Sequence, residues 1–176
     1  AKIEGCTFDL SFDGKSVATS LSVPAEHMVR NATLAAATGL HLGMSLDEVA
    51  AGLASAELTG GRLQRKMIGD FAVLDDSYNA NPDSMRAAIR TMRDLPVEGR
   101  RIAVLGLMAE IGDSAEAEHN AVGQFAAENG IDLLLGIGEE GNWYAAGAGS
   151  GLESKICADQ AEIAEFLKSN AQSSDL

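Results

Sequence analysis

The start of the chain carries the pattern of a β-hairpin. Residues 5–12 (GCTFDLSF) and 17–23 (VATSLSV) are rich in β-favouring residues. They flank Asp13-Gly14-Lys15, where glycine can adopt the positive φ that a tight turn requires. We therefore predict two strands joined at this turn.

Helical spacing of apolar residues follows the predicted hairpin. From Glu26 to Thr38 the apolar positions recur at near-helical intervals, and Gly39 is expected to end this helix. A second helix is predicted to begin after Ser45, with Glu48 at the capping-box position, and to run to about Leu53.

The stretch LTGGRLQ (58–64) places two glycines after a helix and before a new pattern, so we predict a domain boundary near Gly60. Beyond it, residues 62–68 and 71–75 are predicted to be strands joined at Gly69-Asp70. Asn81 suits the N-cap of the next helix, and Pro82 suits its first position because proline lacks the N–H that would be unsatisfied there.

Short apolar runs then alternate with helical patterns to the end of the chain. The next helix should bury Met85, Ala88, Ile89, Met92 and Leu95. Strands are predicted over 101–107, 131–137 and 154–158, with helices over about 114–129 and 160–169. This alternation predicts an α/β fold, with a mostly parallel sheet and helices on both faces. Asp175-Leu176 is expected to begin a further strand, which indicates truncation.

Composition narrows the functional classes. The chain has 176 residues, 46% of them hydrophobic, and a formal net charge of −13, which disfavours general nucleic-acid binding. Without an apolar run of membrane-spanning length or a signal peptide, the expected location is cytoplasmic. Cys6 and Cys157 lack metal or redox spacing and are expected to be reduced thiols.

Two glycine motifs suggest phosphate binding and are set aside. GIGEEG (136–141) matches a dinucleotide fingerprint, but two glutamates would meet the pyrophosphate, and no long helix with a clean N-terminus is expected to follow. We therefore interpret this stretch as a glycine-rich turn at the carboxyl end of a strand. DGKS (13–16) ends like a phosphate loop, but Asp9 occupies the position of the required first glycine.

The isolated histidines and aromatic residues do not suggest catalysis. His27, His41 and His119 show no catalytic or metal-ligand spacing and are expected to be surface or capping residues. Trp143 and Tyr144 are interpreted as packing or surface residues.

Several stretches carry a family resemblance in the same order along the chain. LDDSYNANPDSM (74–85) and RRIAVLGLMAEIG (100–112) resemble the C-terminal domain of the Mur ligases. HMVRNATLAAATGLHLG (27–43), GGRL (60–63) and AEHNAVGQFAAENGID (117–132) resemble the helix that ends the central ATPase domain, the hinge and the next crossover helix. Within the family, the long Asn-rich loop resembles the branch that adds D-alanyl-D-alanine.

The resemblance implies a fragment with two parts: residues 1–59 from the end of the central ATPase domain, and residues 60–176 from a Rossmann-like C-terminal domain lacking its last strand. It implies that the intact parent activates the carboxylate of UDP-N-acetylmuramoyl-tripeptide with ATP and Mg²⁺ and joins it to D-alanyl-D-alanine. The phosphate loop and most Mg²⁺ ligands would lie outside this chain, which should therefore be inactive alone.

The resemblance also implies site residues. Asn31 matches a residue near adenine, Arg62 a hinge residue at the nucleotide, and Asp76 the carboxylate that accepts hydrogen bonds from the ribose. The remaining matches to the loop beside base and sugar are Tyr78, Asn79, Asn81 and Pro82. Met108 and Glu110 are candidate substrate contacts, and no catalytic or metal-binding residue is assigned to this chain.

The chain departs from the family pattern at two positions. Leu107 stands where the family usually has Asp, and Met28 replaces the second residue of a His-Asn pair. Local positive charge comes from Arg62, Arg65 and Lys66. A purely structural interpretation is also open, in which Asp75 and Asp76 are a solvated strand end and Asn81 is a helix cap. A sister ligase that adds another amino acid, or a non-catalytic module, remains an alternative. An unpaired sheet edge could also drive self-association.

Overall fold

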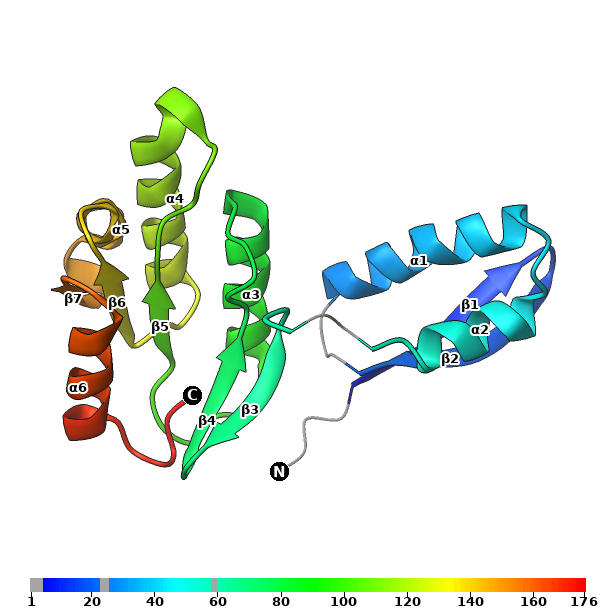
Figure 1. Ribbon diagram of the computed structural model, residues 1–176, viewed down its shortest axis with the longest axis horizontal. Coiled ribbons are helices and arrows are strands. Elements are labelled where there is room, and N and C mark those ends of the chain that lie inside the picture. Colours follow the sequence, from blue (N-terminus) through cyan, green and yellow to red (C-terminus); the bar gives the residue numbers. More distant parts are fainter. Residues whose placement is uncertain (1–4, 23–25, 58–59) are drawn as a thin grey trace. The chain divides into compact units, whose positions relative to one another are not determined.

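The computed structural model describes residues 5–22, 26–57 and 60–176, apart from the side chains of residues 26 and 27. The chain divides into two compact units, Ala1–Gln64 and Arg65–Leu176 (Figure 1). The predicted boundary near Gly60 lies a few residues before this division. His27 was predicted to be a surface or capping residue, but its side chain lies outside the described part of the structure.

The first unit begins with the expected hairpin. β1 (Cys6–Phe12) and β2 (Lys15–Leu21) pair antiparallel, with Phe12 opposite Lys15. Asp13 and Gly14 form the connection with φ of 49° and 72°, the left-handed region that a two-residue hairpin turn uses. The Gly-Lys-Ser stretch is therefore part of a hairpin, as predicted, with Gly14 in the turn and Lys15 and Ser16 already in β2. Residue 23 of the second predicted strand lies outside the described residues.

Two helices follow the hairpin. α1 (Glu26–His41) continues through Gly39, so the expected stop at that residue is wrong. The helix instead ends at His41, and the left-handed Gly43 that follows has φ of 91°, with the Met44 N–H donating to the Gly39 carbonyl at 3.0 Å. Gly39 has a packing role, because a Cβ there would lie 3.1 Å from Met44 Sδ and from Val49 Cγ2.

α2 (Leu46–Ala54) has the predicted capping box. The Ser45 hydroxyl accepts from the Glu48 N–H at 3.2 Å, and Glu48 accepts from the Ser45 N–H at 2.8 Å. Thr19 of β2 donates its hydroxyl to the Ala50 carbonyl at 2.7 Å and so joins the hairpin to this helix. The buried core of the unit comprises Leu10, Ala36, Leu46 and Val49.

The second unit contains a parallel sheet with strand order β5 (Ile102–Leu105), β6 (Leu133–Ile137) and β7 (Glu153–Cys157). Successive β6 side chains enter different clusters, as a strand with both faces covered requires. Leu134 joins one buried cluster, and Leu133 and Leu135 join another.

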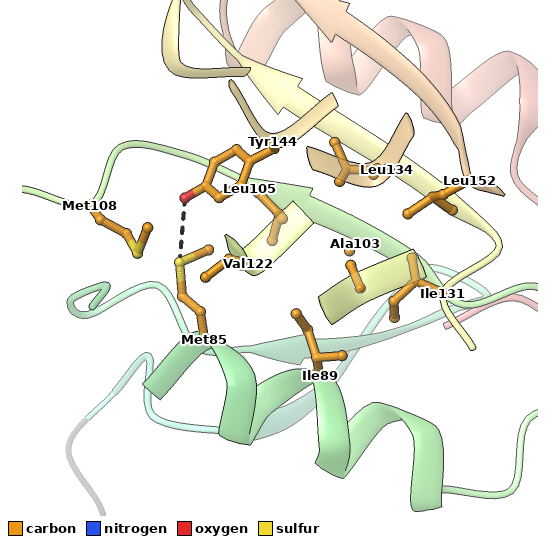
Figure 2. Close-up of a cluster of buried hydrophobic side chains, with 12 residues drawn as sticks. Met85, Ile89, Ala103, Leu105, Met108, Val122, Ile131, Leu134, Tyr144 and Leu152 are labelled. Atoms are coloured by element: carbon orange, nitrogen blue, oxygen red, sulfur yellow. Dashed lines mark hydrogen bonds between the residues drawn. The ribbon is translucent and has the colours of Figure 1, made fainter. Parts of the chain in front are cut away.

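The helices of this unit are α3 (Pro82–Asp94), α4 (Ala115–Glu128), α5 (Glu140–Ala148) and α6 (Gln160–Asn170). The Leu134 cluster receives Met85 and Ile89 of α3, Val122 of α4 and Tyr144 of α5 (Figure 2). The second cluster receives Ile163 of α6. Helices therefore cover both faces of the parallel sheet, which confirms the predicted α/β class.

Two predicted strands at the start of this segment form a separate sheet. β3 (Gln64–Ile68) and β4 (Phe71–Asp75) are hydrogen-bonded neighbours joined through Gly69, whose φ is 61°. The predicted first strand was two residues too long at its start, since Arg62 and Leu63 precede β3.

The end of the chain lies beside β5. The Leu176 N–H donates to the Arg100 carbonyl at 3.0 Å, and the Ile102 N–H donates to the Leu176 carbonyl at 2.8 Å. Asp175 is 5% exposed and accepts from the Arg100 backbone N–H and guanidinium, each at 2.8 Å. Leu176 thus makes strand-like hydrogen bonds at this sheet edge, where the sequence predicted the start of a further strand.

Candidate functional site

The β4–α3 loop (residues 76–81) contains most of the residues predicted to contact a nucleotide. It follows Asp75, the last residue of β4, whose Oδ1 accepts from the Ser77 N–H at 3.1 Å and from the Ser77 hydroxyl at 2.6 Å. Its other oxygen forms an ion pair with Lys66 of β3. Asp75 therefore anchors the loop to the β3–β4 sheet.

These contacts change the acidity of Asp75 and correct one expectation. Hydrogen bonds from Lys66 and then from Ser77 lower the pKa of Asp75 from 3.8 to about 2, because they stabilise the carboxylate. Asp75 is thus a structural carboxylate rather than a solvated strand end. Because Lys66 forms an ion pair with this carboxylate, we do not propose that the Lys66 ammonium binds a phosphate.

The other end of the loop is fixed by the cap of α3. Asn81 Oδ1 accepts from the Ser84 N–H at 2.9 Å, and the Asn81 N–H donates to the Ser84 hydroxyl at 3.1 Å. Pro82 is the first residue of α3, as predicted from its fixed φ and missing N–H. The helix cap uses the side-chain oxygen and the backbone N–H of Asn81, and the Asn81 carbonyl accepts from Ser84 and Met85, so a nucleotide contact by Asn81 stays a prediction.

Between these anchors the loop presents polar and aromatic side chains. Asp76 is half-buried directly after β4, Tyr78 is 61% exposed, and Asn79 is exposed. A carboxylate can accept two hydroxyl groups, and an amide offers both a donor and an acceptor. The loop therefore combines a short, anchored backbone with side chains suited to a ribose and a base.

Asn31 and Arg62, which were also predicted to contact the nucleotide, belong to the first unit. Asn31 is exposed on α1, and its amide Nδ2 lies 3.8 Å from Met28 Sδ. Arg62 is exposed in the segment before β3. Each side chain is accessible within its own unit, and their role in nucleotide binding stays a prediction.

A second loop follows β5 and contains the candidate substrate contacts. We call residues 106–111 the β5–α4 loop. Met108 is 1% exposed and packs in the Leu134 cluster, so its side chain is a core anchor rather than an accessible substrate contact (Figure 2). Glu110 is exposed with φ of 62°, and Leu107 is 54% exposed. The accessible side chains of this loop therefore include Leu107 and Glu110.

Two buried residues from neighbouring helices, His119 and Tyr144, hold this loop. The sequence did not predict the burial of His119. His119 is 0% exposed on α4 and accepts from the Met108 N–H, so the expectation of a surface or capping residue is wrong for this histidine. Tyr144 of α5 is 0% exposed, as its interpretation as a packing residue allowed. Burial, together with the nearby Glu140 carboxylate, raises the pKa of the Tyr144 hydroxyl. A usable signal existed for His119, because Val122 and Ala126 follow it at helical spacing and are equally buried.

The glycine-rich stretch 136–141 has a structural explanation. The helix that follows it, α5, has only nine residues from Glu140, and its N-cap Glu139 makes no side-chain cap hydrogen bond, in agreement with the expectation that no long helix with a clean N-terminus follows. The Gly138 N–H donates to the Cys157 carbonyl at 3.0 Å and is not directed at a phosphate. A Cβ on Gly136 would lie 2.6 Å from the Gly141 Cα, so these glycines allow strand and helix to pack closely.

Two further properties concern the described residues only. No helix in residues 5–22, 26–57 and 60–176 is long and apolar enough to cross a membrane. Within the same residues, no three or more His, Cys, Asp or Glu side chains form a group that could hold a metal ion. Cys157 is buried, which raises the pKa of its thiol, while Cys6 is half-buried.

Comparison with known proteins identifies relatives that match most of the chain. Residues 61–176 match the family model described as "Mur ligase, glutamate ligase domain". The chain is 38% identical to the Escherichia coli protein named "UDP-N-acetylmuramoyl-tripeptide--D-alanyl-D-alanine ligase" over 84% of its length, but it spans only 32% of that protein. It is 32% identical to the Bacillus subtilis protein of the same name, covering 94% of the chain and 37% of the relative.

Solved structures share the fold. The crystal structure of MurF from Acinetobacter baumannii superposes with a TM-score of 0.81 at 30% identity, covering 96% of this chain and 37% of that one. MurF from Thermotoga maritima, solved in complex with ADP, gives a TM-score of 0.80 at 21% identity and covers 98% of this chain and 39% of that one. The chain thus corresponds to about a third of these longer proteins.

Proposed function

Since the chain belongs to the Mur ligase family, we propose that it is part of a longer ATP-dependent ligase that adds D-alanyl-D-alanine to UDP-N-acetylmuramoyl-tripeptide. The names of the relatives at 38% and 32% identity support this choice of substrates. In this proposal residues 60–176 are the C-terminal domain, and residues 1–59 end the central ATPase domain. The observation that carries the proposal is the β4–α3 loop, anchored at both ends and presenting Asp76 and Asn79.

The proposed reaction has two steps. The tripeptide carboxylate attacks the γ-phosphate of ATP, giving an acyl phosphate and ADP. The amine of D-alanyl-D-alanine then attacks the acyl carbon, so that an amide C–N bond forms, phosphate leaves and the amine loses a proton. Such a reaction depends largely on positioning and charge neutralisation. The contribution of this chain is to bind and orient the substrates.

Binding of the nucleotide is assigned to the β4–α3 loop. We propose that the Asp76 carboxylate accepts hydrogen bonds from the two ribose hydroxyls, while Tyr78, Asn79, Asn81 and Pro82 line the base and sugar. The Asp75 and Asn81 anchors reduce the ordering cost of this loop on binding. Asn31 and Arg62 are supported as nucleotide contacts by the family resemblance alone. A cytosolic supply of ATP fits the proposed cytoplasmic location.

Mg²⁺ would neutralise phosphate charge in this chemistry. Within residues 5–22, 26–57 and 60–176, no three His, Cys, Asp or Glu side chains lie together in a group that could hold a metal ion. We therefore derive no step of the reaction from a metal bound by this chain. The missing phosphate-loop motif likewise leads us to propose that the chain alone is inactive.

The nucleotide assignment can be tested by titration of ATP into the full-length ligase. Asp76→Ala should weaken ATP binding about 10- to 100-fold, because hydrogen bonds to a charged group contribute about 1.5–3 kcal/mol. Asn79→Ala should weaken it up to about tenfold, through loss of a neutral hydrogen bond. Asp83→Ala is the matched control, since this carboxylate is fully exposed on the first turn of α3. Unchanged affinity in both loop variants would refute the assignment.

A further inference from the structure

The β5–α4 loop leaves the carboxyl end of a parallel strand, the edge at which doubly wound sheets bind ligands. Its side chains differ sharply in exposure. Leu107 is 54% exposed and Glu110 is exposed, whereas Met108 between them is 1% exposed. The loop therefore has an inner anchor and an outer surface.

Two buried polar side chains hold the backbone of this loop. The Tyr144 hydroxyl donates to the Gly106 carbonyl at 2.7 Å and lies 3.4 Å from Met85 Sδ (Figure 2). The Met108 N–H donates to Nε2 of His119 at 3.1 Å. Backbone groups in irregular segments have no ladder partner, and leaving one buried without a partner is costly. Each of these contacts supplies a partner from a neighbouring helix.

The hydrogen bonds of His119 fix its tautomer. Its Nδ1 lies 2.6 Å from the Ala115 carbonyl, which can only accept, so the proton is on Nδ1. Nε2 therefore keeps its lone pair for the Met108 N–H, which can only donate. The ring is also held in place by Tyr144 and Trp143, whose centroids lie at 4.8 Å and 5.2 Å. The imidazole is thus a rigid acceptor aimed at one backbone amide.

Anchoring at Met108 has a consequence for the next residues. Glu110 has φ of 62°, a left-handed conformation that is uncommon for residues other than glycine, and Gly112 has φ of 68°. Such conformations persist where the surroundings fix them, and they are frequent at ligand-binding sites. The short link of two residues from Met108 to Glu110 carries the constraint from the buried anchor to the exposed carboxylate.

We propose that His119 is a positioning residue, which through the Met108 amide holds Leu107 and Glu110 in the conformation that receives the amine substrate. Tyr144 fixes the start of the same loop at Gly106. This inference rests on the proposed ligase function and deepens it by assigning the β5–α4 loop to the amine subsite. His119 itself does not touch the substrate, because its side chain is fully buried.

The test uses two amide substitutions of His119 in the full-length ligase. In His119→Gln the side-chain oxygen can reach the Nε2 position and accept from the Met108 N–H. In His119→Asn the shorter amide can replace only the Nδ1 contact with Ala115. Both variants are polar and uncharged, so they differ chiefly in the contact that the proposal requires. Tyr144→Phe, which keeps the ring and removes the hydroxyl, tests the second anchor.

Hydrogen exchange of the loop and steady-state kinetics are measured for each variant. His119→Asn should raise exchange in residues 106–111 about tenfold, corresponding to loss of one hydrogen bond, while β6 stays unchanged. The same variant should lower kcat/KM for the amine about 10- to 100-fold with KM for ATP within about twofold. His119→Gln should restore both values to within about threefold, and Tyr144→Phe should raise loop exchange in the same direction.

Two results would overturn the inference. Equal behaviour of the Gln and Asn variants would show that the Met108 contact does not matter. Parallel changes in the loop and in β6 would show a loss of overall stability instead of local positioning. If the wild-type protein shows no amine-dependent turnover, the proposed function fails and the substrate role of the loop fails with it, while the exchange data still decide whether His119 braces the loop.

Discussion

Asp75 offers a sharp test of how the β4–α3 loop is held. Asp75 joins β3 to the β4–α3 loop through its contacts with Lys66 and Ser77. These contacts lower the pKa of its carboxyl to about 2. Asp75→Asn keeps the size of the side chain and removes its charge. We expect the variant to be less stable at pH 7 and to approach the wild type in stability as the pH falls.

The magnitude follows from linkage between protonation and folding. A pKa lowered from 3.8 to about 2 corresponds to roughly 2.4 kcal/mol, at 1.36 kcal/mol per unit. Lys66 is 46% exposed, so solvent screening reduces the expected contribution to about 1 kcal/mol. Because the folded-state pKa is the lower one, this stability is present above about pH 4 and is lost as the pH falls towards 2.

Urea unfolding followed by the fluorescence of Trp143 is the appropriate assay. Trp143 is the sole tryptophan and belongs to the same unit as Asp75, so its signal reports on that unit. Asp70→Asn, in the exposed turn between β3 and β4, is the matched control and should change stability by less than about 0.5 kcal/mol. A difference between wild type and Asp75→Asn that stays constant from pH 7 to pH 3 would refute the reasoning.

Three further substitutions test the packing. Asp175→Asn should cost about 2 kcal/mol in urea unfolding, because the buried carboxylate accepts from the backbone and guanidinium of Arg100; an unchanged midpoint would contradict this role. Gly147→Ala should destabilise the second unit by at least about 1–3 kcal/mol, since its Cβ would lie 1.9 Å from the Asn120 carbonyl oxygen. Gly52→Ala in α2 meets no atom within 4 Å and should instead raise stability by about 0.5–1 kcal/mol, which differential scanning calorimetry can measure.

Features set by local sequence were predictable. The capping boxes at Ser45 and Asn81 and the turn at Asp13-Gly14 depend on residues within a few positions, so short motifs determine them. The parallel sheet was predictable because buried strands with crossover helices leave a strong alternating pattern. The β4–α3 loop was proposed as a nucleotide site from its unusual polar composition and its family resemblance.

Features set by contacts between distant segments were not predictable. α5 was missed because its glycines suggested a loop, whereas Gly147 lies against α4 and allows the two helices to approach closely. Gly39 likewise suggests a helix stop in the sequence, but α1 continues through it, and this glycine packs against Val49 of α2. The roles of His119 and Met108 depend on a hydrogen bond across eleven positions, which no local pattern specifies.

Ligase activity of the full-length protein tests the central claim most directly. Phosphate release from ATP would be measured with UDP-N-acetylmuramoyl-tripeptide and D-alanyl-D-alanine together, and with each omitted in turn, alongside mass-spectrometric detection of the amide product. We expect phosphate release and amide product only with both substrates, and weaker ATP binding in Asp76→Ala. ATP binding without amide formation under saturating substrates would contradict the ligase assignment and favour a non-catalytic nucleotide-binding module.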